Sequence, residues 1–166
     1  MQPKPDENFD PIERIKQPSS RHCFGCGIDN PHGLGLTFYA VGPDRVECDT
    51  VLGDRFQGYP GVVHGGIVAT MLDEIVGRVL LIGDSTRRFM TAKLVVRYRR
   101  PVPTNQPLKV IAWLTRDKGR YATAHSEIRL SDGTLAAESE GTMAEVPGEH
   151  MTEEQLEAIG WRVYPD

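Results

Sequence analysis

The chain has 166 residues, 39% of them hydrophobic, and a formal net charge of −4. One domain of this length can bury a sizeable core, and a near-balanced charge argues against a general nucleic-acid-binding protein, whose domain is usually clearly basic. No apolar run approaches the ~20 residues of a membrane span, and the first residues lack the apolar core of a signal peptide. We therefore expect a soluble, cytoplasmic protein without a nucleic-acid partner.

Residues 1–20 are polar and proline-rich, and we expect them to form an N-terminal extension of the domain. Asp10 is a suitable N-cap, and Pro11 is a suitable first helical residue. These two residues predict a short helix over the following "IERIKQ".

Cys23 and Cys26 follow in "RHCFGCGIDNPHG", and a CxxC pair can form half of a zinc site. The third cysteine, Cys48, stands alone, and the sequence offers no second pair of ligands with similar spacing. An odd number of cysteines also argues against a disulfide framework. The sequence thus favours a glycine-rich turn whose cysteines pack as small apolar side chains, and it predicts no metal site.

The next elements are predicted to be a hairpin, one long helix and a four-stranded meander, in that order. The hairpin strands lie near 34–41 and 45–52, and the helix covers about 66–82. Four alternating stretches follow at 91–103, 107–117, 120–130 and 133–146, the last two joined by a Ser-Asp-Gly turn. A final helix begins at Thr152, where Gln155 completes a capping box.

This order of elements predicts an α+β fold in which an antiparallel sheet of about five to six strands wraps around one long central helix. One helix cannot cover both faces of a sheet, so the other face meets solvent or a second subunit. We expect the main domain to span residues 21–147, followed by a helical tail over residues 148–166.

Asp73 is an unusual residue for a mostly apolar helix. At ~100° per residue it shares one narrow arc with small residues, while the large apolar side chains point elsewhere. Small neighbours leave room for a ligand to approach the carboxylate. The adjacent Glu74 lies on another side, where Arg78 at i+4 is expected to form an ordinary surface ion pair with it.

His64, Gly65 and Gly66 stand where this helix begins. The first N–H groups of a helix lack intrahelical acceptors and carry the positive end of its dipole. Glycines let a ligand carbonyl come close to those groups, which suits stabilisation of a developing oxyanion. A tight loop-to-helix turn would also account for the two glycines.

The spacing of these two features predicts a site shared between two chains. Nine residues separate His64 from Asp73, which is ~13 Å along a helix. The two positions cannot reach one carbonyl group within the same helix. If both act, the helix N-terminus of one subunit faces Asp73 of another, and the protein is at least a homodimer.

Three segments together resemble a known family: "CFGCGIDNPHGLGL", "FQGYPGVVHGGIVATMLDE" and "TAKLVVRYRRPVP". Over roughly residues 22–146 the chain is similar to acyl-CoA thioesterases of the hotdog fold, in the PaaI-like (phenylacetate-pathway) group. The resemblance implies an antiparallel sheet around one helix, a dimer that often pairs into a homotetramer, and hydrolysis of an acyl-CoA thioester. Coenzyme A is then part of the substrate, and no separate cofactor is expected.

The resemblance also implies roles for individual residues. Asp73 matches the catalytic carboxylate, acting as base on water or as nucleophile. Gly65 and Gly66 match the turn whose N–H polarises the thioester carbonyl, and His64 orients that loop or the substrate. Thr91 matches a Ser/Thr that places the water. Some relatives carry an Asn where this chain has Gly58, so the neighbouring Gln57 is the candidate for a second contact at the carbonyl.

A basic cluster on the strand after the helix is the candidate for binding the anionic coenzyme A. Its members are Arg97, Arg99 and Arg100, and alternation places Arg97 and Arg99 on the same face as Thr91. An exposed strand kept soluble by charge would show the same residues.

Three other functions remain open from the sequence. A hotdog module that binds acyl-CoA without turnover would need no carboxylate beside the carbonyl. A hotdog dehydratase acting on hydroxyacyl thioesters would use His64 as its acid–base group, but the chain lacks the proline-rich histidine loop of those enzymes. A zinc-dependent module would use Cys23 and Cys26.

Overall fold

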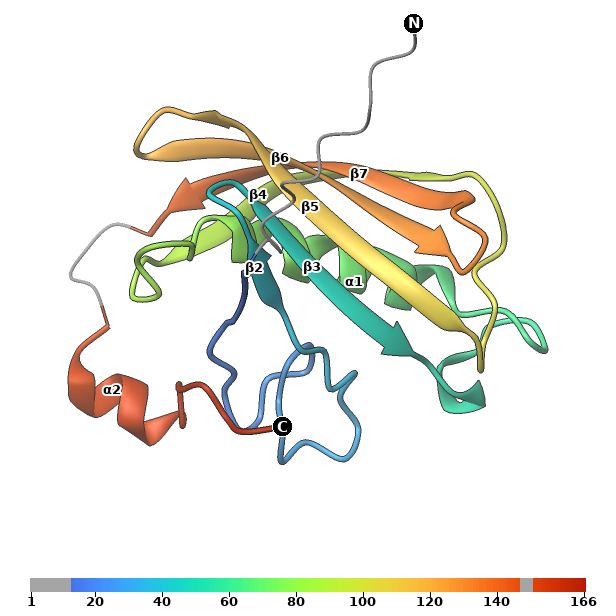
Figure 1. Ribbon diagram of the computed structural model, residues 1–166, viewed down its shortest axis with the longest axis horizontal. Helices are drawn as coiled ribbons and strands as arrows, with labels where there is room; N and C mark the ends of the chain where they lie inside the picture. The colour runs from blue at the N-terminus through green and yellow to red at the C-terminus, as the bar shows by residue number, and fades with distance from the viewer. Residues whose placement is uncertain (1–12, 147–150) are drawn as a thin grey trace, which may run out of the picture.

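The computed structural model describes residues 13–146 and 151–166. In these ranges seven strands form one antiparallel sheet, in the order β1-β2-β3-β5-β6-β7-β4 (Figure 1). Their bounds are β1 Arg14–Lys16, β2 Tyr39–Val41, β3 Arg45–Val51, β4 Phe89–Tyr98, β5 Pro107–Asp117, β6 Tyr121–Leu130 and β7 Leu135–Glu145. The helices are α1 Gly65–Val79, α2 Glu153–Ala158 and the short 3-10 turn η1 Asp54–Phe56.

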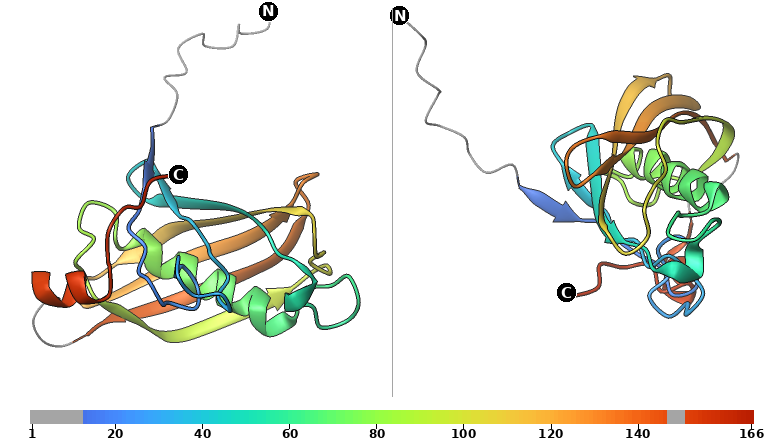
Figure 2. Two further views of the ribbon diagram at one scale, coloured as in Figure 1. Left: turned by 90° about the horizontal axis from the view of Figure 1, so that it is seen from below. Right: turned by 90° about the vertical axis from the view of Figure 1, so that its right-hand side faces the viewer.

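Helix α1 lies along the concave face of the curved sheet, which wraps around it (Figure 2). Its large apolar side chains are buried against the strands: Val68, Met71, Leu72, Ile75, Val76 and Val79. Full burial of one such side chain stabilises the fold by about 1.5–3 kcal/mol. The predicted α+β arrangement of a sheet around one central helix is therefore confirmed.

Gly141 on β7 sets how closely the helix approaches the sheet. A Cβ atom at this position would lie 2.9 Å from Cγ2 of Val76 on α1, which is closer than carbon atoms pack. The absence of a side chain lets α1 sit directly on the strand.

The predicted hairpin and helices occur with shifted ends. The first hairpin strand is only β2, because residues 34–38 form no ladder, and α1 ends at Val79, three residues before its predicted end. The capping box of the final helix is confirmed, since Thr152 accepts from the Gln155 amide and the Gln155 side chain accepts from the Thr152 amide. The described helix α1, at 15 residues, is too short to cross a bilayer, and no longer helix occurs in the described ranges.

The short helix predicted over "IERIKQ" is wrong in its described part. Residues 14–16 form β1, which pairs antiparallel with β2 at one edge of the sheet; Asp10, Pro11 and Ile12 lie outside the described residues. Pairing with an existing strand edge satisfies the backbone of a segment that is too short to hold a helix by itself.

Strand β4 forms the other edge of the sheet and contains a bulge at its start. Thr91 lies opposite Met143 on β7, but Lys93 already lies opposite Thr142, so Ala92 is the extra residue. A bulge shifts the alternation of side chains by one position. Thr91 therefore faces α1, as Leu94 and Val96 do further along the strand.

Candidate active site

The N-terminus of α1 is capped by its own histidine. His64 Nδ1 accepts a hydrogen bond from the Gly66 amide at 3.0 Å, and its backbone oxygen accepts from Ile67 and Val68. A Cβ on Gly66 would lie 3.1 Å from His64 Nδ1, so the small residue lets the imidazole close over the helix end. The histidine thus occupies one of the donors that a helix N-terminus leaves free.

Gly65 presents a different group at the same place. Its carbonyl accepts a 2.8 Å hydrogen bond from the Tyr98 hydroxyl on β4. Within the described ranges its amide N–H donates to no protein acceptor. Of the two glycines, Gly65 therefore offers a backbone donor at the positive end of the helix dipole.

This helix end opens onto a cavity of about 680 Å³. Its walls come from the loop before α1, from the first turn of the helix and from the end of β4, with Tyr59, Val63, Val68, Tyr98, Arg99 and Arg100 among the lining residues. A cavity of this size, mostly apolar with two cations at its rim, is suitable for an amphipathic anionic ligand.

Asp73 and Thr91 meet at the middle of α1. The Thr91 hydroxyl donates to Asp73 Oδ1 at 2.7 Å, and the carboxylate is only half-buried. The β4 bulge is the reason that Thr91 faces the helix, so the two predicted residues are brought together by a feature that alternation did not predict. A carboxylate held in this way is oriented and still accessible to water.

A second cavity, about 420 Å³, surrounds this pair. Besides Asp73 and Thr91, it is lined by the Cys23–Cys26 turn, by Met90 and by the C-terminal tail at Met151, Ile159 and Trp161. The tail is held here because Trp161 Nε1 donates to the Ser85 carbonyl at 3.1 Å. The tail thus forms a wall of the cavity that contains the carboxylate.

The structure does not bring the helix N-terminus and Asp73 together within one chain. His64 and Gly65 line the first cavity only, and Asp73 and Thr91 line the second only. Eight residues of α1 separate Gly65 from Asp73, a rise of ~12 Å.

The predicted basic cluster is divided. Arg99 and Arg100 line the first cavity beside Gly65, and Arg99 is also paired with Glu138 on β7. Arg97 lies on the opposite side of β4 from Val96, a core residue, and does not line this cavity. The expectation that Arg97 shares a face with Thr91 is wrong, because the bulge at Ala92 separates the two alternation patterns.

Gln57 lies in the loop before α1, where its Oε1 accepts from the Gly61 amide at 3.3 Å. The residue is exposed and forms an isolated bridge with Val63. The side-chain oxygen thus holds the loop that carries His64, and Gln57 is not among the residues that line the first cavity.

Arg78 and Glu74 do not form the surface ion pair that their spacing predicted. Arg78 is only 4% exposed; its guanidinium donates to the Pro18 carbonyl at 2.6 Å and stacks over the Phe38 ring. Burial raises the pKa of Glu74, with Arg78 as a partly compensating charge. The N-terminal segment and the C-terminal tail cover this side of the helix, which helical periodicity alone does not show.

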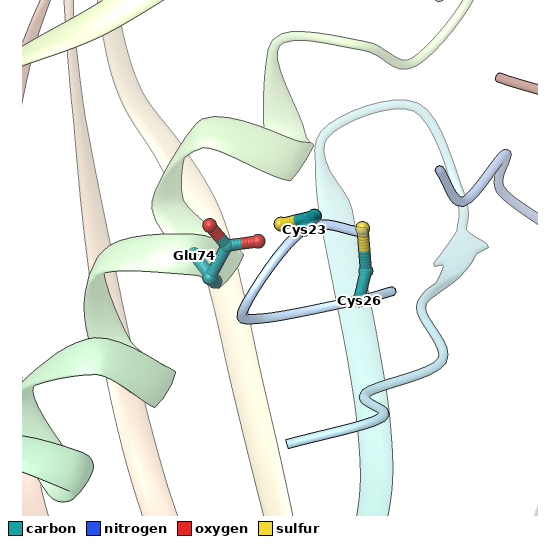
Figure 3. Close-up of side chains that lie close together, drawn as sticks. All are labelled: Cys23, Cys26 and Glu74. Atoms are coloured by element: carbon teal, nitrogen blue, oxygen red, sulfur yellow. The ribbon is translucent and has the colours of Figure 1, made fainter. Parts of the chain in front are cut away.

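The Cys23–Cys26 turn packs against Glu74, so the side chains of all three residues lie close together (Figure 3). Both cysteines have free thiols. A hydrogen bond from the Cys23 thiol lowers the pKa of Cys26 to about 5, and the same bond raises the pKa of Cys23. The spacing of residues in the sequence does not predict that Glu74 lies next to this turn.

Two further residues of the site were missed from the sequence. Tyr98 was expected only as a strand residue, yet its hydroxyl holds Gly65. Trp161 belongs to the predicted helical tail, and it lines the second cavity. The phenolic hydroxyl of a strand tyrosine, which can donate a hydrogen bond, was the only signal available for the first; for the second there was none.

Comparison with known proteins shows which proteins have a similar sequence and fold. Residues 60–137 match the model of the thioesterase superfamily. A crystal structure of a thioesterase superfamily protein, RHA08564, is similar with a TM-score of 0.69 and 32% identity, covering 75% of this chain and 60% of that one. The predicted hotdog fold is thereby confirmed, and the chain is similar to thioesterase superfamily proteins over this part of its length.

Among named relatives, the acyl-coenzyme A thioesterase THEM4 of Rattus norvegicus is 33% identical over 103 residues, which are 60% of this chain and 44% of that protein. The chain spans less than half the length of the THEM4 relatives that it matches. A hypothetical thioesterase of Streptococcus pneumoniae, crystallised with coenzyme A, shares the fold at a TM-score of 0.62 and 17% identity, covering 70% of this chain and 88% of that one. The narrower PaaI-like grouping stays a prediction.

Proposed function

We propose that the protein hydrolyses an acyl-CoA thioester to a free acid and coenzyme A, at a site formed between two copies of the chain. The observation that carries the proposal is the Asp73–Thr91 pair: a half-buried carboxylate, held by a 2.7 Å hydrogen bond, lining a cavity. The acyl-coenzyme A thioesterase relatives and the coenzyme A complex of a structural neighbour support the same substrate class.

The N–H group of Gly65 is proposed to bind the thioester carbonyl oxygen. Negative charge develops on this oxygen when the carbonyl carbon is attacked, and a fixed backbone donor at a helix N-terminus stabilises that charge. Arg99 and Arg100, at the rim of the same cavity, are proposed to bind the phosphates of coenzyme A. His64 then serves to hold the loop and the first turn in place.

Asp73 of the second copy is proposed to drive the attack. As a general base it takes a proton from water, whose oxygen bonds to the carbonyl carbon; as a nucleophile its own oxygen forms that bond. In either route the carbon–sulfur bond then breaks and the coenzyme A thiolate leaves. The nucleophilic route leaves a mixed anhydride with Asp73, which water then hydrolyses to the free acid. In a single turnover in ¹⁸O-labelled water, attack of this water on the Asp73 carbonyl carbon puts label into the Asp73 carboxyl group, which the general-base route does not do.

The free edge of β4 is the proposed contact between the two copies. Within the described ranges β4 pairs only with β7, and Met90, Val95 and Tyr98 are large exposed residues on this strand. An edge strand offers unpaired backbone groups to a second strand. Antiparallel pairing centred between Leu94 and Val95 would set Tyr98 of one copy opposite Thr91 of the other.

This pairing would bring the two halves of the site together. Within one chain Tyr98 holds Gly65, and Thr91 holds Asp73. If Tyr98 lies opposite the second copy's Thr91, the N-terminus of α1 lies beside the second copy's Asp73. The homotetramer that the resemblance implies stays a prediction, which light scattering on the same sample would decide.

The first test is release of free thiol from short-chain, long-chain and aryl acyl-CoAs, comparing the wild type with Asp73→Ala. Turnover that depends on Asp73 supports the proposal. Tight acyl-CoA binding without turnover across the panel would instead favour the binding module.

The second test mixes two inactive subunits, Asp73→Asn and Gly65→Pro. In a mixed dimer one site keeps both intact groups and the other loses both. Equal, random mixing should therefore restore roughly a quarter of wild-type activity, since half of the dimers are mixed and each has one working site. A site contained within one chain would show no recovery.

A further inference from the structure

The Cys23–Cys26 turn combines with α1 in a way that neither the proposed hydrolysis nor the resemblance explains. Cys23 Sγ, Cys26 Sγ and a Glu74 carboxylate oxygen all lie within 4.8 Å of one another. Figure 3 shows the two sulfur-bearing side chains on the turn and the Glu74 carboxylate reaching toward them from the helix. We propose that Cys23, Cys26 and Glu74 bind a thiophilic divalent cation, with Zn²⁺ as the best fit.

The geometry is close to what zinc requires. Zinc–sulfur bonds of about 2.3 Å and zinc–oxygen bonds of about 2.0–2.2 Å set ligand atoms roughly 3.5–4 Å apart in a tetrahedral site. Starting from at most 4.8 Å, the three ligand atoms need to approach one another by no more than about 1.3 Å to reach this spacing. All three residues line the second cavity, from which a water molecule can supply the fourth ligand.

The backbone of the turn is built to bring the two sulfurs against Glu74. A Cβ on Gly25 would lie 2.5 Å from Glu74 Cδ, and a Cβ on Gly27 would lie 2.3 Å from the Cys23 carbonyl oxygen. A side chain at Gly27 would clash with backbone atoms, and a side chain at Gly25 would displace the Glu74 carboxylate from its place beside the turn. The Gly27 amide donates to that same carbonyl at 2.8 Å and closes the turn.

The surrounding charges are also suitable for a dication. On metal binding both thiols release their protons to solvent, so that two thiolates and the Glu74 carboxylate carry three negative charges. The buried Arg78 guanidinium acts electrostatically on both Cys26 and Glu74. Adding a divalent cation to these four groups gives a net charge of zero. Without it, the two thiols and the carboxyl group share one partly buried location with a single cation.

A second cluster of metal-binding residue types is less suitable. His125, Glu127 and Glu138 also lie within 4.8 Å of one another, but on the strands β6 and β7. Glu127 is already paired with Arg129, and Glu138 with Arg99. These carboxylates have cationic partners of their own, and the cluster contains no sulfur ligand.

The sequence predicted no metal because it offered no second pair of ligands beside Cys23 and Cys26. The fold supplies the missing partner from α1, 48 residues after Cys26. A metal here would join the N-terminal loop to the helix next to Asp73, and so fix one wall of the second cavity. This role is independent of thioester hydrolysis and is tested without substrate.

The experiment uses the full chain, stripped with a chelator and kept reduced. A thiol titration first confirms that all three cysteines are reduced. Co²⁺ is then added as a spectroscopic stand-in for Zn²⁺. The expected result is one equivalent of Co²⁺ bound per chain, with a thiolate-to-metal charge-transfer absorption band that Zn²⁺ abolishes by displacement.

Three variants and a control locate the site. Cys23→Ser and Cys26→Ser should each lose most of the charge-transfer band. Glu74→Gln should keep the band but bind more weakly by at least the ~10-fold that even outer-sphere changes cause. Cys48→Ala removes a cysteine buried elsewhere in the core and should bind like the wild type. Circular dichroism identifies any variant that fails to fold. Of the two serine variants, Cys23→Ser should disturb folding less, because Cys23 is only half-buried.

Two results would overturn the proposal. One is a wild-type protein with three reduced thiols that shows no charge-transfer band at millimolar Co²⁺. The other is metal uptake that the cysteine variants leave unchanged, which would move the metal to the His125 cluster.

Discussion

The two ends of the stretch Gly65–Asp73 on helix α1 present different kinds of chemistry. The N-terminal end offers a backbone N–H, in an exposed first turn beside a cavity of about 680 Å³. The middle offers a side-chain carboxylate, half-buried beside Thr91 in a cavity of about 420 Å³. A backbone N–H that can bind a carbonyl oxygen and a carboxylate that can act as a base are both present on α1. A straight helix keeps these two groups ~12 Å apart. Their separation is the structural reason to expect a functional dimer.

The two ends also differ in how they are held. The N-terminal end is held by few contacts: His64 caps Gly66 locally, and Tyr98 on β4 holds Gly65. The middle depends on segments far apart in the sequence, since β4, the cysteine turn and the C-terminal tail all meet around Asp73 and Glu74. Substitutions at the first end should therefore act on one step of the chemistry, and those in the middle should also be sensitive to the surrounding fold.

The largest effect is expected in the middle, from Asp73→Asn. The amide keeps the shape of the side chain and its contact with Thr91 but cannot take a proton from water. We expect kcat for acyl-CoA hydrolysis to fall by about 10²–10⁴-fold, the usual contribution of a general base. Steady-state thiol release measures this fall.

A matched control for this variant is Asp49→Asn. Asp49 is an exposed carboxylate on β3, paired with Arg14 and Lys109, and does not line either of the two cavities beside α1. Its neutralisation should leave kcat within a factor of about two. Near-normal hydrolysis by Asp73→Asn would remove the carboxylate from the mechanism.

The next effect tests the other end of α1, through Gly65→Pro. Proline removes one backbone N–H and is well tolerated at the first position of a helix, and the His64 ψ angle of 137° suits a residue that precedes proline. Loss of one oxyanion-binding donor should lower kcat by about 10²-fold. The measurement is the same thiol-release assay, with helicity checked by circular dichroism.

Gly65→Ala separates the donor from the glycine itself. Alanine keeps the N–H, and its Cβ would lie 3.7 Å from the Tyr98 ring, an ordinary contact distance. Its loss of activity should be much smaller than that of the proline variant. Equal losses in both variants would mean that space at this position, and not the N–H group, is what the reaction requires.

A smaller effect is expected from Thr91→Val, which returns to the middle of α1. Valine keeps the shape of threonine but removes the donor to Asp73 Oδ1. A hydrogen bond to a charged group contributes about 1.5–3 kcal/mol, and partial exposure reduces this value. We expect a fall in kcat on the order of 10-fold. Thr91→Ser, which keeps the hydroxyl, should recover most of the activity; if it is as slow as valine, the hydroxyl is not the important group.

Both ends of the Gly65–Asp73 stretch were predictable from the sequence. His64, Gly65, Gly66 and Asp73 could be interpreted from helix geometry alone, because periodicity and the helix dipole act within one segment. The four alternating stretches that follow the helix also predicted the strands of the sheet that wraps around it. These features depend on residues close together in the chain.

Features that depend on distant segments were not predictable. The bulge at Ala92 turned Thr91 toward the helix and separated it from Arg97, and only the pairing of β4 with β7 reveals this shift. Burial of Arg78 required two termini to fold over the helix, and the approach of Glu74 to the cysteine turn required the loop and the helix to pack. Charges spaced i, i+4 imply a surface pair only when nothing covers that side of the helix.

The smallest expected effect is on the pH dependence of stability. It reports how well the core behind α1 is shielded from water, in contrast to the exposed N-terminal end of the helix. Cys48, fully buried in the core behind the helix, is the extreme case. Burial raises the pKa of its thiol from 9.0 to about 12. Above about pH 9 the thiol of the unfolded chain loses its proton while the folded chain keeps it, so the folded state binds more protons and the free energy of unfolding falls as pH rises.

Urea unfolding of the wild type and of Cys48→Ala between about pH 8 and about pH 10 measures this term. The wild type should lose about 1 kcal/mol more stability over this range than the alanine variant, which has no thiol to ionise. Taking the difference between the two proteins cancels the titration of the lysines and tyrosines that both contain. Parallel pH dependence would mean that water reaches Cys48 in the folded protein, and that the core behind α1 is no drier than the helix end that opens to solvent.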